Sequence, residues 1–259
     1  MDGTAVLALM DLNMQEMYRE DARTTAGGFI VERDGMLLCG SPHGSEFTNM
    51  LVVVGRGRAS AIRSALDQTF RSAGLPCSVW TRAHTDGALE NELRREGFEY
   101  LLTVPAMMLS NEVPAPSAPP ELELRSVTDD ADRRDYLGVM VPAWGVYGIE
   151  AESTACHFPT VDSLVGPMKT AFVAYRAGAA VAGAILYLSH EVAGIGWVGT
   201  VPEACARGYG AAVTWAVVRE GRRRGARFSN LQASPLGASV YRRMGFTSPT
   251  EYRVFVLRG

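Results

Sequence analysis

The chain has 259 residues, 47% of them hydrophobic, and a formal net charge of −3. This length allows one large core or two smaller ones. A charge so close to zero does not suggest nucleic-acid binding. The lack of a run of about 18 uncharged apolar residues argues against a membrane span. No basic region precedes an apolar run at the start, so no export signal is expected.

The four cysteines are scattered along the chain, at Cys39, Cys77, Cys156 and Cys205. Their spacing matches no zinc or iron–sulfur motif, so no metal is expected. Without an export signal they are expected to be free thiols in a reducing compartment, which predicts a cytoplasmic protein.

The first half alternates predicted strands and helices. Its first helix is indicated by Val6, Met10, Met14 and Met17 at roughly helical spacing. An Asp34-Gly35 turn predicts a hairpin. The predicted elements are a helix over 6–22, a hairpin over 29–39, a strand over 50–54, a helix over 59–73, a strand over 77–80, a helix over 87–96 and a strand over 99–109.

The composition then changes abruptly. Residues 111–120 contain four prolines in ten positions, which is typical of a semi-extended linker. The sequence therefore predicts a first domain over residues 1–110, a proline-rich linker over 111–120 and a second domain over 121–259.

The second half has a similar alternation. A hairpin is expected around Ala177-Gly178. Pro202 is expected to end the strand that immediately precedes this proline. The predicted elements are a strand over 122–127, a helix within 129–147, a loop over 150–166, a hairpin over 171–188, a strand over 197–201, a helix over 211–220, a strand over 227–231, a helix over 237–243 and a strand over 252–257.

An internal repeat links the two halves. The segment from Leu93 to Phe98, Leu-Arg-Arg-Glu-Gly-Phe, resembles Tyr-Arg-Arg-Met-Gly-Phe from Tyr241 to Phe246. The two glycines are 148 positions apart, which is a domain-sized period. The match is short enough to arise by chance, but the same order of strands around it favours a duplication.

The stretch from Gly196 to Gly210 reads as strand, glycine-bearing loop and helix. Glycines allow close approach of the backbone to a ligand, and the free N–H groups of a helix's first turn suit a phosphate. Neither a Gly-x-x-x-x-Gly-Lys-Ser/Thr loop nor a full Gly-x-Gly-x-x-Gly fingerprint is present. On its own, the pair Gly208 and Gly210 is equally typical of a helix start without a ligand.

Together with the block from Leu231 to Phe246, this stretch resembles the GNAT superfamily of acetyl-CoA-dependent N-acetyltransferases. The family loop Arg/Gln-x-x-Gly-x-Gly/Ala falls on Cys205, Gly208 and Gly210, and the family tyrosine before Gly-Phe falls on Tyr241. Cys205 for Arg/Gln and Ser234 for an asparagine are departures. The resemblance is strong from about residue 169 to 256.

This resemblance implies an α/β fold with a mixed α+β sheet, built as two GNAT-like domains in tandem. The first half lacks both motifs, because Leu93 stands where Tyr241 stands and the segment 54–59 lacks the loop spacing. It is therefore interpreted as a degenerate copy that kept the fold and lost the cofactor.

The resemblance also implies site residues for acetyl-CoA. Backbone N–H groups at the end of the strand would polarise the acyl carbonyl, and Tyr241 would protonate the leaving thiolate. The residues expected to contact acetyl-CoA are Val198, Gly199, Thr200, Val201, Cys205, Ala206, Arg207, Gly208, Tyr209, Gly210, Ala211, Ser234 and Tyr241.

Tyr241 and Ser234 are the two residues predicted to serve catalysis. Ser234 could contact the pantetheine arm or orient Tyr241, and a helix N-cap is an equally compatible role. Tyr241 could alternatively be a packed aromatic residue. Arg207 could face a phosphate or only solvent.

The general base is not evident, because residues 195–201 contain no carboxylate. The available groups are His157, Glu150, Glu152, His190 and Glu191. Each could equally be structural or solvated, and His157, in a loop that could form a substrate wall, is preferred.

The predicted function is transfer of an acetyl group from acetyl-CoA to a primary amine of a small molecule, by direct attack in a ternary complex. Acylation of a protein amine and a non-catalytic acyl-CoA-binding regulatory module are the alternatives, because a fold does not determine a function. We expect no nucleic-acid or membrane partner, and a monomer or a homodimer.

Overall fold

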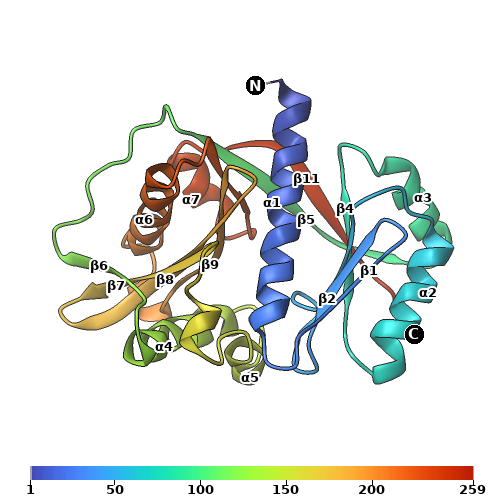
Figure 1. Cartoon of the computed structure of the whole chain (residues 1–259), viewed down its shortest axis with the longest axis horizontal. Coiled ribbons are helices and arrows are strands. Elements are labelled where there is room, and N and C mark those ends of the chain that lie inside the picture. The colour runs from blue at the N-terminus through green and yellow to red at the C-terminus, as the bar shows by residue number, and fades with distance from the viewer. Residues whose placement is uncertain (1, 259) are drawn as a thin grey trace.

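The computed structural model describes residues 2–258, and across them one mixed sheet of eleven strands runs through the whole molecule (Figure 1). The strand order is β1-β2-β3-β4-β11-β5-β10-β9-β8-β7-β6. Apart from β11, which lies between β4 and β5, first-half strands occupy one end of the sheet and second-half strands the other. None of the described helices is long and apolar enough to cross a membrane.

The first half follows the predicted elements closely. The Asp34-Gly35 turn has both φ angles positive, at 47° and 73°, as a two-residue hairpin turn requires. Its elements are α1 (Gly3–Thr24), β1 (Phe29–Arg33), β2 (Met36–Gly40), β3 (Met50–Val53), α2 (Ala59–Thr69), a 3₁₀ turn (Arg71–Ala73), β4 (Ser78–Arg82), α3 (Gly87–Arg95) and β5 (Glu99–Ser110).

The second half contains the same alternation. Its elements are β6 (Leu122–Ser126), α4 (Asp130–Gly145), α5 (Ala151–Ala155), β7 (Lys169–Arg176), β8 (Ala179–Ser189), β9 (Val192–Thr200), α6 (Tyr209–Arg223), β10 (Phe228–Gln232), α7 (Ala238–Arg243) and β11 (Thr247–Val256).

Three sequence-based boundaries were wrong. Strand β9 begins at Val192 rather than at residue 197. Residues 150–166 are not simply a loop, because they contain α5 and a 3₁₀ turn over Val161–Ser163. The last strand begins at Thr247 rather than at residue 252. Its polar beginning, Thr247 to Thr250, is mostly exposed yet pairs with β5, so tertiary pairing extends the strand where local pattern does not.

The halves exchange their final strands. β11 lies between β4 and β5, antiparallel to both, and β5 in turn pairs antiparallel with β10. Equivalent backbone bonds mark the exchange, since Ala83 donates to Glu251 at 3.0 Å and Ala233 donates to Pro105 at 2.9 Å. The sheet is therefore continuous because each half completes the other.

The short repeat has the same local structure twice. Gly97 and Gly245 follow α3 and α7 with φ angles of +81° and +98°. Phe98 donates to Leu93 O, and Phe246 donates to Tyr241 O, both at 3.0 Å. The shared helix ending and the matching element order agree with two copies of one unit, while the division at residues 111–120 stays a prediction.

Helix α1 belongs to the first half but also packs on the second (Figure 1). Its Asn13 side chain donates to Tyr187 O at 3.1 Å and to Val192 O at 3.2 Å. In return Asn230 donates to Met10 O. Because these amides satisfy buried backbone groups, α1 is held at a defined position over β8 and β9.

Candidate active site

Strand β9 is bulged near its end and separates there from β10. Trp197 has a φ angle of +48°, and the register with β8 shifts between the pairs Ile185–Gly196 and Gly183–Gly199. The parallel pairing with β10 stops at Gly194. From that point the two strands diverge, which leaves a gap in the sheet bordered by unpaired backbone.

The loop after β9 presents a row of backbone donors. Pro202–Ala204 form a 3₁₀ turn, and Gly208, at φ +82°, immediately precedes α6. Among the described residues, no carbonyl accepts from the N–H groups of residues 206–211. Six successive free donors at the start of a 15-residue helix suit a phosphate group.

Local geometry explains why glycine occupies positions 208 and 210. A Cβ on Gly208 would meet no atom within 4 Å, so the space beside it is open, but its positive φ disfavours other residues. A Cβ on Gly210 would lie 3.0 Å from Thr200 Oγ1. Cys205 is exposed and directs its thiol toward Val201 O at 3.6 Å, while Arg207 is exposed. The residues present therefore fit a pyrophosphate through backbone rather than side chains.

The equivalent positions of the first half are filled. The Arg82 guanidinium donates to Val54 O and Gly55 O and pairs with Asp86, which bridges the ends of β3 and β4. The Glu92 carboxylate accepts from Ala59 N at the start of α2. A guanidinium and a carboxylate thus occupy the places that the second half leaves open.

Tyr241 and Ser234 follow β10, one of the two strands that border the gap. Tyr241 is buried, contacts Phe246 edge-on and lies near Thr214 of α6. Burial raises the pKa of its phenol well above the usual value, so the group stays protonated. Ser234 Oγ accepts from Gly237 N at 3.1 Å and lies 3.0 Å from Tyr147 Oη. Ser234 therefore caps the turn before α7, whereas the N-cap of α7 itself is Gly237 and not Ser234.

A cavity of about 310 Å³ lies between the two halves, where β9 and β10 diverge. The second half contributes residues beside the gap, including Gly196, Trp197 and Ser234, and the first half contributes α1, β2, β3 and β4. The first-half lining residues include Met17, Tyr18, Asp21, Ala22, Thr25, Cys39, Met50 and Trp80. The cavity wall is therefore shared by both halves.

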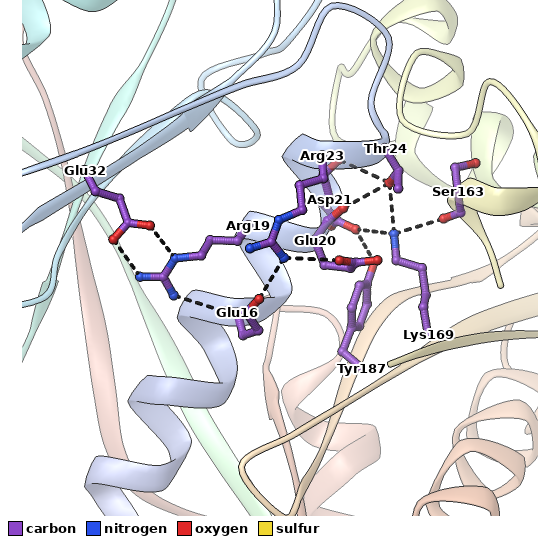
Figure 2. Close-up of polar contacts among 10 residues, drawn as sticks. All are labelled: Glu16, Arg19, Glu20, Asp21, Arg23, Thr24, Glu32, Ser163, Lys169 and Tyr187. Carbon is purple, nitrogen blue, oxygen red and sulfur yellow. Dashed lines mark hydrogen bonds and ion pairs between the residues drawn. The ribbon is translucent and has the colours of Figure 1, made fainter. Parts of the chain in front are cut away.

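Asp21 is the only Asp, Glu, Lys or Arg among the described lining residues. Its carboxylate has three donors, of which Lys169 and Tyr187 are drawn in Figure 2. It accepts from Lys169 Nζ at 3.3 Å, Tyr187 Oη at 2.5 Å and Trp197 Nε1 at 2.9 Å. Lys169, 1% exposed, also donates to Thr24 and to the Ser163 carbonyl. These bonds hold α1 against the β9 bulge and leave no free charge toward the cavity.

His157 is 7% exposed and lines the same cavity, packed against Trp197 with ring centroids 4.9 Å apart and ring planes tilted by 47°. Its Nδ1 lies 2.9 Å from Thr25 Oγ1, whose own proton is donated to Asp21 O at 2.7 Å. Nδ1 must therefore carry the ring proton, which leaves Nε2 with a free lone pair. Nε2 is buried and has no partner among residues 2–258.

The pKa of His157 is lowered to about 4, chiefly by burial; Asp21 opposes this shift and Lys169 adds to it. The ring is accordingly neutral at pH 7. Trp144 Nε1 is a second buried atom of the cavity lining without a partner in the described chain. The lining residues thus carry one buried acceptor and one buried donor without a partner, on mostly apolar walls.

The other residues considered as a base lie outside the cavity. His190 and Glu191 form the turn between β8 and β9, at the opposite end of β9 from the bulge, and Glu191 pairs with Arg227. Glu150 is exposed at the start of α5, and Glu152 pairs with His43. Of the five groups, the structure brings only His157 to the gap.

Sequence reasoning did not identify Asp21, Trp197 or Tyr147 as neighbours of the gap. Asp21 is one acidic residue among several on a surface helix, and nothing in its local pattern separates it from Glu16 or Glu20. A sequence signal exists only for Trp197, a large aromatic residue between two glycines of a strand.

The sequence matches no protein-family model and no curated protein. Solved structures do match. A GCN5-related N-acetyltransferase from Kribbella flavida superposes with a TM-score of 0.73 at 16% identity, covering 96% of this chain and 95% of that one. A GCN5-related N-acetyltransferase from Sphaerobacter thermophilus gives 0.56 at 19% identity, with 87% and 81% covered.

A tandem GNAT protein from the clavulanic acid biosynthesis pathway gives a TM-score of 0.59 at 14% identity, with 91% of this chain and 85% of that one covered. At such identities the likeness concerns the fold. The chain therefore has the GCN5-related N-acetyltransferase fold in its tandem form, as the sequence motifs predicted.

Proposed function

We propose that this protein transfers an acetyl group from acetyl-CoA to a primary amine of a small molecule. One observation carries the proposal, namely the gap between β9 and β10. The free N–H groups of residues 206–211 follow the end of β9, and the cavity is lined by residues of both β9 and β10 where the two strands diverge. A long donor bound along the loop can thus present its acyl end to a separately bound acceptor.

The donor, when bound, supplies a thioester carbonyl open to attack. The loop donors at residues 206–211 would hold the pyrophosphate, and unpaired N–H groups at the end of β9 would polarise the carbonyl. The amine nitrogen forms the new N–C bond while the C–S bond breaks and its electron pair stays on sulfur. The amine gives up one proton and the sulfur takes one, so the products are an amide and a free thiol.

Tyr241 is proposed as the proton donor to sulfur. Its raised pKa keeps the phenol protonated at neutral pH, although a strongly raised pKa also makes proton release less favourable. The proton must therefore move as negative charge develops on sulfur, when the hydrogen bond from the phenol becomes strong.

The cavity supports a small acceptor rather than a protein surface, since its volume is only about 310 Å³ and half of its lining residues are buried. A non-catalytic acyl-CoA-binding module is the second candidate. It is favoured by Cys205 and Ser234, which depart from the family motif, and it predicts donor binding without turnover.

Consumption of acetyl-CoA, measured as thiol release with panels of amino acids, monoamines, polyamines, aminoglycosides and peptides, tests the proposal. We expect release with at least one small amine. Calorimetric binding of CoA without release on any acceptor would instead support the non-catalytic module, and acetylation of peptides alone would support the protein-directed alternative.

A further inference from the structure

The side chains that line the shared cavity suit a ligand that carries no charge away from its reacting amine. Apart from Asp21, the described lining holds no acidic or basic side chain of the Asp, Glu, Lys or Arg type, and Asp21 is occupied by three donors. A second ammonium group in this space would have to lose its water without gaining a counter-ion. The free-energy cost of such burial is high.

The cavity also has a fixed point for an amine. His157 Nε2 is a buried atom without a partner, and the contact with Thr25 sets the tautomer in which Nε2 carries a lone pair and no proton. An N–H group from a ligand would satisfy this acceptor, whereas a carboxylate or carbonyl would repel it. The ring cannot turn freely, because Trp197 and Phe158 pack against it at centroid distances of 4.9 and 6.2 Å.

We propose that the acceptor is an apolar monoamine whose nitrogen donates a hydrogen bond to His157 Nε2 and whose uncharged body lies between the two halves, against Met17, Met50 and Trp80. This inference rests on the proposed acetyl transfer, and it names the acceptor class of that site. The first half, in which side chains fill the positions equivalent to the loop, here forms the wall that selects the acceptor.

The amine enters the cavity in its neutral form. The charged groups that face His157 are Asp21 and Lys169, and they are paired with each other. His157 therefore acts as a hydrogen-bond acceptor for a free amine and not as a base strong enough to deprotonate an ammonium ion in solution. Turnover should accordingly rise with pH as the free-amine fraction of the acceptor rises.

Hexylamine and 1,6-diaminohexane test the class directly, because they differ only in a second amine at the far end. Binding to the protein without acetyl-CoA is followed by tryptophan fluorescence, since Trp80, Trp144 and Trp197 all line the cavity. Turnover is followed as thiol release. We expect hexylamine to bind at least about tenfold more tightly and to give at least about tenfold higher kcat/KM.

The role of His157 is tested by His157→Phe, which keeps a ring against Trp197 but removes the acceptor, and by His157→Gln, which restores an acceptor oxygen. We expect hexylamine binding to fall about tenfold in the first variant and to recover in part in the second. His190→Asn is the matched control, because it removes an exposed imidazole at the far turn and should change nothing.

The outcomes separate this inference from the proposed function. Selective hexylamine binding without acetyl-CoA consumption would leave the acceptor class standing and remove the transfer. Turnover of diamines, polyamines or aminoglycosides at or above the hexylamine rate would leave the transfer standing and overturn the apolar class. Absence of hexylamine binding to the unmodified protein would also overturn it, and that measurement depends on no variant folding.

Discussion

The Tyr241 side chain is 9% exposed and packs edge-on against Phe246, with ring centroids 5.7 Å apart. Tyr241→Phe keeps this packing and removes only the hydroxyl. If the hydroxyl acts as the thiolate leaves, kcat should fall by about 10²–10⁴-fold. CoA affinity should hardly change, because the lost interaction belongs to the transition state.

Three measurements on this variant decide the role: kcat, CoA affinity by calorimetry, and melting temperature. An unchanged kcat would remove Tyr241 from the mechanism. A loss of folding would instead indicate that Tyr241 serves packing. The tyrosine ring does pack closely on Gly237, where an added Cβ would lie 2.9 Å from it.

His157 should make the stability of the protein depend on pH. Its pKa is about 4 in the folded chain and 6.5 as the ordinary value, so the unfolded state binds more protons between these limits. Unfolding free energy should therefore fall as pH drops from about 6.5 toward 4, by up to about 3 kcal/mol from this group. Above pH 6.5 the histidine contributes no slope.

Urea unfolding at pH 7 and at pH 4.5 measures this effect in the native chain and in His157→Phe. We expect the variant to lose less stability on acidification, by the equivalent of close to one proton. Equal pH slopes in both proteins would mean that the buried ring is charged or exposed in solution.

At the scale of elements, the loop before α6 makes a prediction about charge. Gly208→Asp places a carboxylate beside the N–H groups of residues 206–211, and Gly208→Asn adds nearly the same volume without charge. Both tolerate a positive φ better than other side chains. Calorimetry should show one CoA site per chain, abolished in the aspartate variant and only weakened in the asparagine variant.

Two results would contradict this assignment. Equal loss in both variants would indicate steric strain at φ +82° rather than an anionic ligand. Two sites per chain, or one that survives Gly208→Asp, would locate CoA in the first half. The Arg82 guanidinium and the Glu92 carboxylate fill the corresponding positions there, so a single site is expected.

Most helices and strands could be predicted from local sequence, because turn chemistry and helical spacing act over a few residues. The Asp34-Gly35 turn and the glycine after α3 are examples. The start of β11 was missed because Thr247 to Thr250 lack the alternation that defines a strand, and only the partner strand β5 imposes the conformation. The orphan Nε2 of His157 was equally out of reach, because it depends on Thr25 in the other half.

For the whole molecule, the repeat and the linker predicted a tandem arrangement, but not the exchange of β5 and β11. Strand order is decided by pairing between segments that are far apart in the chain. β11 is antiparallel to both β4 and β5, and β5 is antiparallel to β10, so strand direction alone does not reveal the exchange. The exchange has a functional consequence, since it places β5 of the first half beside β10, while α1 of the first half packs on β9. A cavity shared by both halves could not have been inferred from either half alone.

The buried ion pair between Asp21 and Lys169 ties these halves together, and Asp21→Asn should therefore destabilise the entire protein. The change leaves the Lys169 ammonium, 1% exposed, without a counter-charge, and such losses cost about 3–5 kcal/mol. Adding Lys169→Met should recover much of that free energy, because a methionine needs no partner there. Urea unfolding followed by circular dichroism and by tryptophan fluorescence measures both effects.

Glu16→Gln is the matched control on the same helix, where the carboxylate joins the outer Arg19 and Arg23 network and should contribute less than about 1 kcal/mol (Figure 2). Equal costs for Asp21→Asn and Glu16→Gln would show that the buried pair does not hold the halves. Because α1 and the exchanged strands connect the halves at two places, the native protein and Asp21→Asn should each unfold in one transition with both probes. Two separated transitions in Asp21→Asn alone would show that this pair, rather than the strand exchange, couples the halves.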